Sequence, residues 1–416
     1  MALMFGMFKA CLLAATLAAL MASPAAAASF SAKRGINLDI WTTWPPEEKW
    51  GERDVILPFP EWRRFLKPAD LEALKADGFD FVRMPVDPVP FLSERSASLT
   101  DDLLLSVRDS ARLVNAAGLK VVVDMHIVPA GGNRSLGTKD VLDDDATFDR
   151  YVELLRRMAS TLAMEDPSMV AFELMNEPTL GCEGAEAKAW ADRLHRLFAA
   201  ARASATRLTL VLTGACWSSA EGLAALDPKT FPDDNLMWGF HSYDPFVLTH
   251  QGATWTGDFI NYVTGIPYPP DAVPREELDA AVAKVKARID AEAPWSRRAG
   301  MKSYFDELLG EIDTKEKLAA VMEKPFATVA AWAKTNGIAP ADILFGEFGM
   351  IRQEWKGDYI APPEQRAAYY RDMIAHAEQH GFAWSIWGYG GAFGVVESFE
   401  GKKAEPAVLD MVRKLP

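Results

Sequence analysis

The stretch 169-MVAFELMNEP-178 has the composition of a buried β-strand that ends in polar residues. Its apolar residues are nearly continuous and do not alternate with polar ones, which is typical of a strand covered on both faces in a parallel sheet. Pro178 follows at once, and a proline biases the residue before it toward extended geometry. The stretch therefore predicts a buried strand that presents Asn176 and Glu177 at its carboxyl end.

Seven further apolar runs bounded by turn signals are distributed along the chain, with helical patterns between them. Several of these patterns start at Asp or Pro and end at Gly or before a strand. Eight parallel strands that alternate with helices close into a barrel, so we predict an α/β fold of the (β/α)8 TIM-barrel type. The other predicted strands are 34–40, 79–86, 119–126, 208–214, 235–243, 342–349 and 382–389, and the clearest helices are 68–78, 101–118, 146–163, 185–203 and 362–381.

The connection between the sixth and seventh strands departs from this rhythm. We predict that residues 247–341 form an elaborated connection, in which 249–274 lies as a loop over the barrel mouth and 275–293 and 324–337 are helices. A separate small domain is the alternative, but no Ser/Gly-rich or Pro-rich linker isolates the segment. We therefore interpret residues 29–416 as a single barrel domain.

The first 28 residues predict a secretory signal peptide. They contain one basic residue, Lys9, then a short apolar stretch, and an alanine-rich segment ending near Ala28. An uncleaved membrane anchor is the alternative. No later run is long and apolar enough to cross a bilayer, so we expect an exported protein, periplasmic or extracellular, without membrane insertion after signal cleavage.

The net charge limits the classes of partner to be expected, and the cysteines raise the question of a disulfide. The formal net charge is −14, and acidic and basic residues are interspersed, which argues against nucleic acid as a partner. Cys11 leaves with the signal peptide, so Cys182 and Cys216 remain in an oxidising compartment. They form a disulfide or are two small buried hydrophobic residues, and the sequence leaves both open. A monomer is the default expectation.

Polar residues close several of the predicted strands. In a TIM barrel the active site lies at the carboxyl ends of the strands. Each such residue alone has a common structural explanation, such as a helix cap, an ion pair or a core histidine. Their convergence on one end of the barrel favours a single site over independent structural roles. This candidate site consists of Arg83, His126, Asn176, Glu177, His241, Tyr243, Glu347 and Trp387.

Two glutamates at opposite sides of a barrel mouth suit glycoside cleavage. One carboxylic acid protonates the leaving oxygen, and a second carboxylate acts on the other face of the sugar ring. Glu177 suits the acid/base role. Glu347, near Arg83 and Tyr243, would be the ionised nucleophile, and Asn176 would hydrogen-bond the sugar 2-hydroxyl.

Tryptophans supply apolar faces for sugars. Trp387 closes the last predicted strand and would lie under the sugar's C–H bonds. Five others lie in or near predicted loops at the mouth and either stack on further sugars or pack a loop, namely Trp41, Trp44, Trp50, Trp217 and Trp255.

The boxes NEP at 176–178, GEFG at 346–349 and RGINL at 34–38 resemble those of glycoside hydrolase family 5, the cellulase family of retaining (β/α)8 hydrolases. The eight candidate residues fall, in order, at the strands where that family carries its shared active-site residues. The resemblance implies double displacement through a covalent glycosyl-enzyme, with no metal and no organic cofactor. It also implies a β-glucan polysaccharide or oligosaccharide as substrate, with a β-mannan or another β-glycoside as the alternative.

Two other classes of protein are alternatives to a glycoside hydrolase. A zinc hydrolase on the same barrel would use histidines at strand ends, but the sequence has no H-x-H pair on the first strand and no H-E-x-x-H helix. A glycan-binding barrel without turnover has no need of both glutamates.

Overall fold

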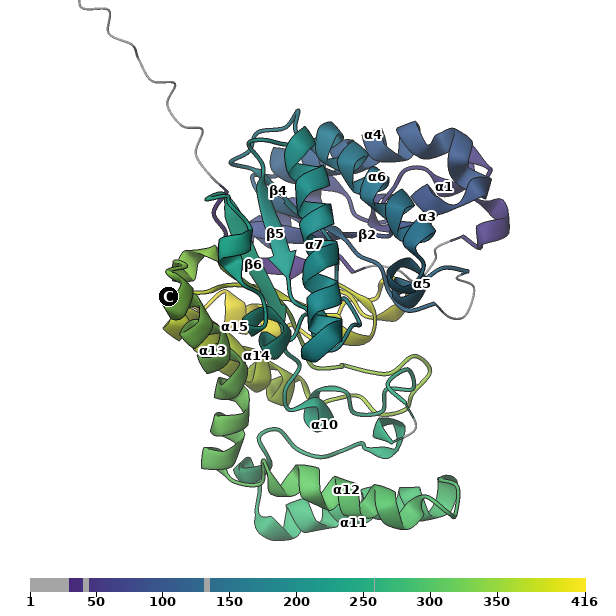
Figure 1. Cartoon of the computed structure of the whole chain (residues 1–416). Helices are drawn as coiled ribbons and strands as arrows, with labels where there is room; N and C mark the ends of the chain where they lie inside the picture. The colour runs from purple at the N-terminus through teal and green to yellow at the C-terminus, as the bar shows by residue number, and fades with distance from the viewer. Residues whose placement is uncertain (1–29, 40–44, 131–134, 258) are drawn as a thin grey trace, which may run out of the picture.

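The computed structural model describes residues 30–39, 45–130, 135–257 and 259–416 and contains a closed barrel of eight parallel strands in sequence order (Figure 1). The predicted TIM-barrel fold is therefore confirmed. Each strand lies within one of the predicted runs. The strands are β1 Arg34–Asn37, β2 Phe81–Val86, β3 Lys120–Met125, β4 Val170–Glu173, β5 Thr209–Thr213, β6 Leu236–His241, β7 Ile343–Phe348 and β8 Ala383–Ile386.

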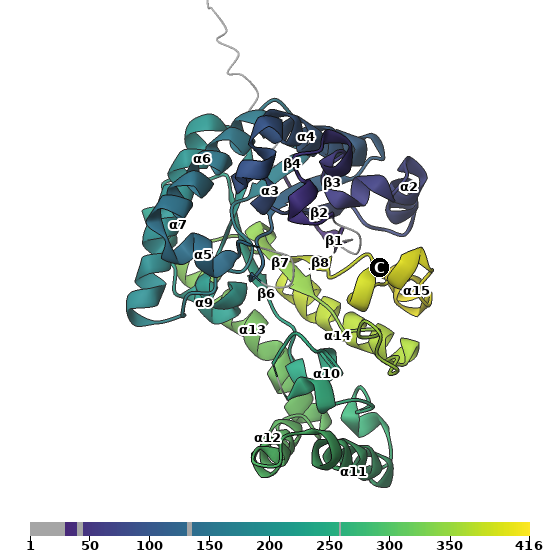
Figure 2. The ribbon, with the colours of Figure 1, turned by 90° about the vertical axis from the view of Figure 1, so that its right-hand side faces the viewer.

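Long helices surround the strands (Figure 2). The five helices predicted most clearly are present, with ends that differ by no more than two residues from the prediction. They are α2 Pro68–Ala76, α4 Thr100–Ala116, α6 Asp145–Leu162, α7 Gly184–Ser204 and α14 Pro363–His380. Shorter helices lie in the connections, namely α1 Arg53–Ile56, α3 Val89–Leu92, α5 Thr138–Asp143, α8 Ala215–Ser218, α9 Ala220–Ala224 and α15 Ala407–Val412.

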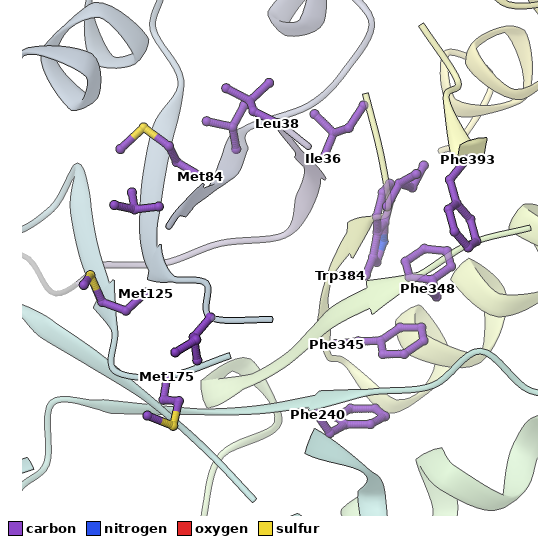
Figure 3. Close-up of a cluster of buried hydrophobic side chains, with 14 of the residues drawn as sticks. Ile36, Leu38, Met84, Met125, Met175, Phe240, Phe345, Phe348, Trp384 and Phe393 are labelled. Carbon is purple, nitrogen blue, oxygen red and sulfur yellow. The ribbon is translucent and has the colours of Figure 1, made fainter. Parts of the chain in front are cut away.

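The strands bury side chains on both faces, as their continuous apolar runs predict. Outward-facing side chains form the large core between strands and helices, where the Phe345 ring stacks between those of Phe240 and Phe348 (Figure 3). A smaller cluster that includes Phe81, Val122, Ala171 and other residues near the strand starts fills the barrel interior. Because side chains alternate between faces, the residues two positions further along face the interior again.

In β2, β3 and β4, the interior-facing position that follows the apolar cluster holds a charged residue. These residues are Arg83, Asp124 and Glu173, all of which are at most 1% exposed. The interior therefore changes from an apolar floor to a charged layer along the strand direction, and the charged layer lies just below the mouth.

The connection between β6 and β7 is elaborate, as predicted. It contains α10 Phe246–Thr249, α11 Arg275–Glu292, α12 Arg298–Gly310 and α13 Lys315–Asn336. The helix predicted at 275–293 corresponds to α11, whereas α12 was missed. Figures 1 and 2 show α11 and α12 side by side, beyond α10 on the mouth side of the barrel.

The predicted start of the next helix, at residue 324, was wrong. The structure begins α13 at Lys315, where the Thr314 hydroxyl accepts a hydrogen bond from the Lys317 backbone N–H at 3.4 Å. Pro325 therefore lies inside the helix, although proline usually marks a helix start. Its side chain is buried and lines the cleft described below, so packing outweighs the lost backbone hydrogen bond.

Membrane and export predictions concern different parts of the chain. In the described ranges no helix combines the length and apolar character that a bilayer crossing requires. The predicted signal peptide, residues 1–28, falls outside the described residues.

Candidate active site

Arg83 is the centre of the charged layer. Its guanidinium, fully buried on β2, makes a two-pronged ion pair with Glu173 at 2.7 and 2.8 Å. It also contacts Asp124 at 2.9 Å and Glu347 at 2.6 Å. A guanidinium has five N–H donors in a fixed fork, so one residue can hold several carboxylates that come from different strands. Two amide oxygens complete its contacts, those of Asn37 at 3.0 Å and Asn176 at 2.9 Å.

An irregularity in β7 directs Glu347 into the barrel. Leu344 faces the interior and Phe345 faces the helices, so regular alternation would turn Glu347 outward with Phe345. The pairing register of β7 with β8 shifts between Phe345 and Phe348, and its pairing with β6 shifts as well. Such bulges re-aim side chains near active sites. Here the shift lets Glu347 reach Arg83.

Glu347 receives a second donor from the opposite side. The Tyr243 hydroxyl donates to its other carboxylate oxygen at 2.9 Å. Together with the guanidinium, this hydrogen bond stabilises negative charge on a carboxylate that is only 3% exposed. Burial and the charge of Glu347 raise the pKa of the Tyr243 hydroxyl well above its usual value, so this group remains a donor.

Glu177 lies across the mouth from Glu347. It follows β4 and has a φ of 38°, which is uncommon for a residue other than glycine. One carboxylate oxygen of Glu177 lies within 4.8 Å of one of Glu347. Burial raises the pKa of Glu177 to about 7, with Arg83 acting against this rise and Glu173 adding to it.

His241 is the direct partner of Glu177. Its Nδ1 lies 3.0 Å from the Glu177 Oε1 and 3.7 Å from the Glu347 Oε2. Burial lowers the pKa of His241 to about 4, so the imidazole is neutral at neutral pH. The ring has room only because residue 346 is glycine, since a Cβ there would lie 2.9 Å from the His241 Nε2.

Of the remaining predicted residues, His126 and Trp387 line the same opening, and Asn176 is buried beside His126. The His126 Nδ1 lies 2.6 Å from the Asp124 Oδ2, and the His126 ring stacks on Trp387 with centroids 5.2 Å apart. The Asn176 amide nitrogen lies 3.4 Å from the His126 Nε2. The structure therefore brings all eight predicted site residues to one end of the barrel.

The site opens into a cleft of about 790 Å3. Trp217 and Trp255 line it and are 49% and 54% exposed. Trp50 is 1% exposed, and its indole N–H donates to a backbone carbonyl at 2.8 Å. Of the two outcomes that the sequence left open for Trp50, the structure therefore has the residue packing a loop. Trp41 and Trp44 lie outside the described residues.

A disulfide fixes the loop that follows Glu177. Cys182 and Cys216 are bonded, with Cα atoms 5.3 Å apart, so of the two outcomes that the sequence left open the structure has the disulfide. The same loops are joined by backbone hydrogen bonds from Cys216 to Leu180 at 2.8 Å and from Trp217 to Pro178 at 2.9 Å. These links attach the loop that carries Trp217 to the segment that carries Glu177.

The sequence-based prediction of the site did not include four of its polar residues. Asp124, Glu173 and Asn37 lie within strands, and they contact Arg83. Asp39, 7% exposed, accepts a hydrogen bond from the Gly390 backbone N–H at 3.0 Å, and burial raises its pKa to about 7. A charged residue inside an apolar run was the available signal, because a buried charge requires a partner.

Three side chains of the site have the spacing of metal ligands. Atoms of Glu177, His241 and Glu347 all lie within 4.8 Å of one another. Both oxygens of Glu347 are already engaged by Arg83 and Tyr243. The positive charge of a guanidinium 2.6 Å from one of these oxygens would repel a divalent cation, so the geometry favours an ion-pair network over a metal centre.

Comparisons with known proteins agree with this arrangement. Residues 58–392 match the model of the cellulase family, glycosyl hydrolase family 5. Endoglucanase 3 of Fibrobacter succinogenes is 26% identical over 344 residues, which are 80% of this chain and 47% of that protein, so the chain spans about half of its length. Endoglucanase C of Acetivibrio thermocellus is 23% identical over 86% of this chain and 91% of its own.

Solved structures show the same fold. The cellulose synthase subunit Z of Clostridioides difficile superposes with a TM-score of 0.63 at 20% identity, over 92% of this chain and 99% of the other. Since the family model extends over most of the chain and through both glutamates, the chain belongs to glycoside hydrolase family 5 and is an O-glycosyl hydrolase.

Proposed function

We propose that this protein is a secreted, retaining hydrolase of β-glucans that uses Glu177 as acid/base and Glu347 as nucleophile. The spacing of the two carboxyl groups carries the proposal. Retaining glycosidases have carboxyl groups about 5 Å apart, whereas inverting enzymes need roughly 6.5–9.5 Å to admit a water. Oxygens within 4.8 Å fit the retaining geometry.

In the first step, the Glu347 carboxylate attacks the anomeric carbon while Glu177 gives its proton to the departing glycosidic oxygen. The C–O bond to the leaving sugar breaks, and an ester to Glu347 forms. In the second step, Glu177 takes a proton from water, the water oxygen attacks the anomeric carbon, and the ester bond breaks. The two inversions leave the anomeric configuration unchanged.

The surrounding residues supply the charge distribution that these steps need. A pKa of about 7 keeps a large share of Glu177 protonated near neutral pH. Arg83 and Tyr243 hold the Glu347 carboxylate in place. The Asn176 amide would donate to the sugar 2-hydroxyl, and the Trp387 ring, stacked on His126, would lie under the sugar.

Different observations support the proposed substrate class and the proposed export. The relatives Endoglucanase 3 and Endoglucanase C are named for glucan cleavage, and the exposed Trp217 and Trp255 provide flat apolar surfaces beside the glutamates. The predicted signal peptide at residues 1–28 and the Cys182–Cys216 disulfide are both typical of an exported protein.

Azide rescue tests the two roles. With an aryl β-cellobioside, Glu347→Ala should give the α-glycosyl azide, because azide takes the place of the missing nucleophile. Glu177→Ala should give the β-azide, because azide attacks the glycosyl-enzyme from the other face. Product anomers are assigned by NMR. Glu183→Ala, an exposed glutamate in the same loop, is the matched control and should turn over normally. The same anomer from both variants would rule out this division of roles.

A further inference from the structure

A second hollow, of about 350 Å3, adjoins the cleft that holds the two glutamates. The two share Asp244, Phe246 and Thr256 as lining residues, so they lie on either side of the same three side chains. The far wall of the second hollow comes from the insertion between β6 and β7, with Tyr304 and Leu308 of α12. The helices α11 and α12 of the elaborated connection lie beyond α10 (Figure 2), and α12 supplies Tyr304 and Leu308 to the hollow.

A third hollow, of about 540 Å3, follows on the same side. It shares Phe259 and Tyr304 with the second hollow and reaches Ser296 in the turn between α11 and α12. Tyr304 is 50% exposed, and its ring lies 5.3 Å from that of Phe259. Tyr304 therefore stands at the junction of the two hollows.

The lining of the second hollow suits an uncharged sugar. Aromatic rings accept the C–H face of a pyranose, and carboxylates accept hydrogen bonds from its hydroxyls. The exposed rings are Phe246 and Tyr304, and the exposed carboxylates are Asp244 and Glu311. None of the described residues that line this hollow is basic, so the lining itself offers an anionic sugar no positive charge.

We propose that the second hollow is a distal subsite that holds further uncharged sugar units of the glucan chain being cleaved between Glu177 and Glu347. The inference rests on the proposed function. The shared lining residues identify the occupant, because a glucan chain that extends from the glutamates past Phe246 reaches this hollow next. The subsite gives the enzyme a preference for long chains over short ones.

The test compares two substrates, an aryl β-cellobioside and a soluble β-glucan polymer. Tyr304→Ala should lower the ratio of kcat/KM for the polymer to kcat/KM for the aryl glycoside by roughly two- to tenfold, the effect of losing one aromatic contact. The fall should come from a higher KM for the polymer. Tyr304→Phe keeps the ring and should retain the wild-type ratio.

Trp295→Ala is the matched control. Trp295 is 84% exposed and lies in the turn between α11 and α12, but it lines none of the three hollows. A wild-type ratio for Tyr304→Ala, or an equal fall for Trp295→Ala, would overturn the subsite.

A binding assay separates this inference from the proposed function. Retardation of the Glu347→Ala protein in gels containing β-glucan should weaken when Tyr304→Ala is added, whether or not the wild type hydrolyses the polymer. Unchanged retardation would overturn the subsite alone, whereas a wild-type protein that cleaves neither substrate would overturn the proposed function.

Discussion

Replacing Arg83 by lysine keeps a positive charge in the barrel but removes the forked donor geometry. A lysine ammonium has three N–H donors at a single point, whereas the guanidinium serves side-chain oxygens of five residues. At least two buried oxygens would therefore lose their donor. The five residues are Asn37, Asp124, Glu173, Asn176 and Glu347.

The size of the effect follows from burial. Asp124, Glu173 and Glu347 are each at most 3% exposed, so water cannot replace the missing donor. A hydrogen bond to a charged group contributes about 1.5–3 kcal/mol, and breaking a buried ion pair costs about 3–5 kcal/mol. We expect Arg83→Lys to lower the free energy of unfolding by roughly 3–5 kcal/mol. Displacement of Glu347 by about 1 Å would also lower kcat roughly 100-fold.

Urea unfolding and steady-state kinetics on the aryl β-cellobioside measure both effects. Arg366→Lys is the matched control, because Arg366 is also buried but donates to the backbone carbonyls of Met350, Phe393 and Gly394. It should lose stability with kcat changed only a few-fold. If Arg83→Lys unfolds within about 1 kcal/mol of the wild type and keeps kcat within about threefold, Arg83 does not organise the site as described.

Three other predictions concern single features. Because protonated Glu177 is the acid and its pKa is about 7, kcat/KM should fall as the pH rises above about 7; this limb should vanish in Glu177→Gln with an activated aryl substrate, and its persistence would assign the limb to another group. The Cys182→Ser/Cys216→Ser variant should lose roughly 2–4 kcal/mol of unfolding free energy for its 34-residue loop, and an unchanged urea midpoint would contradict this. Burial raises the pKa of Asp39 from 3.8 to about 7, so its carboxyl contributes stability that is complete below pH 3.8 and lost as the pH rises through 7. Asp39→Asn should therefore show a smaller fall in Tm than the wild type between pH 4 and 8. A larger fall would show that the pKa of Asp39 is not raised in the folded protein.

The fold and the two glutamates were predictable because both leave local signals. Parallel strands buried on two faces read as continuous apolar runs, and the NEP box follows β4 closely while the GEFG box closes β7. The roles of residues in the loops are harder to predict. A tryptophan in a loop leaves the same sequence pattern whether it is buried like Trp50 or lines a cleft like Trp217. Only the three-dimensional packing decides between those outcomes.

The charged layer could not be assembled from the sequence. Arg83 and Glu173 are 90 residues apart in the sequence. Each interrupts an apolar run, but the sequence does not show which residue it pairs with. Nor does the run containing Glu347 reveal the register shift that turns this side chain inward, because strict alternation predicts the opposite face. The ion pair between Arg83 and Glu347 depends on that shift.

The same buried charges that hold Glu347 in place also affect the pKa of Glu177, the proposed acid. Arg83 lowers the pKa of Glu177, but its positive charge is shared with Asp124, Glu173 and Glu347, and the charge of Glu173 raises that pKa again. In the proposed first step, ester formation removes the negative charge of Glu347 less than 5 Å from Glu177. With one carboxylate neutralised, the unchanged guanidinium favours the ionised form of Glu177 more strongly. Glu177 is thus protonated when a leaving group needs a proton and ionised when a water must lose one.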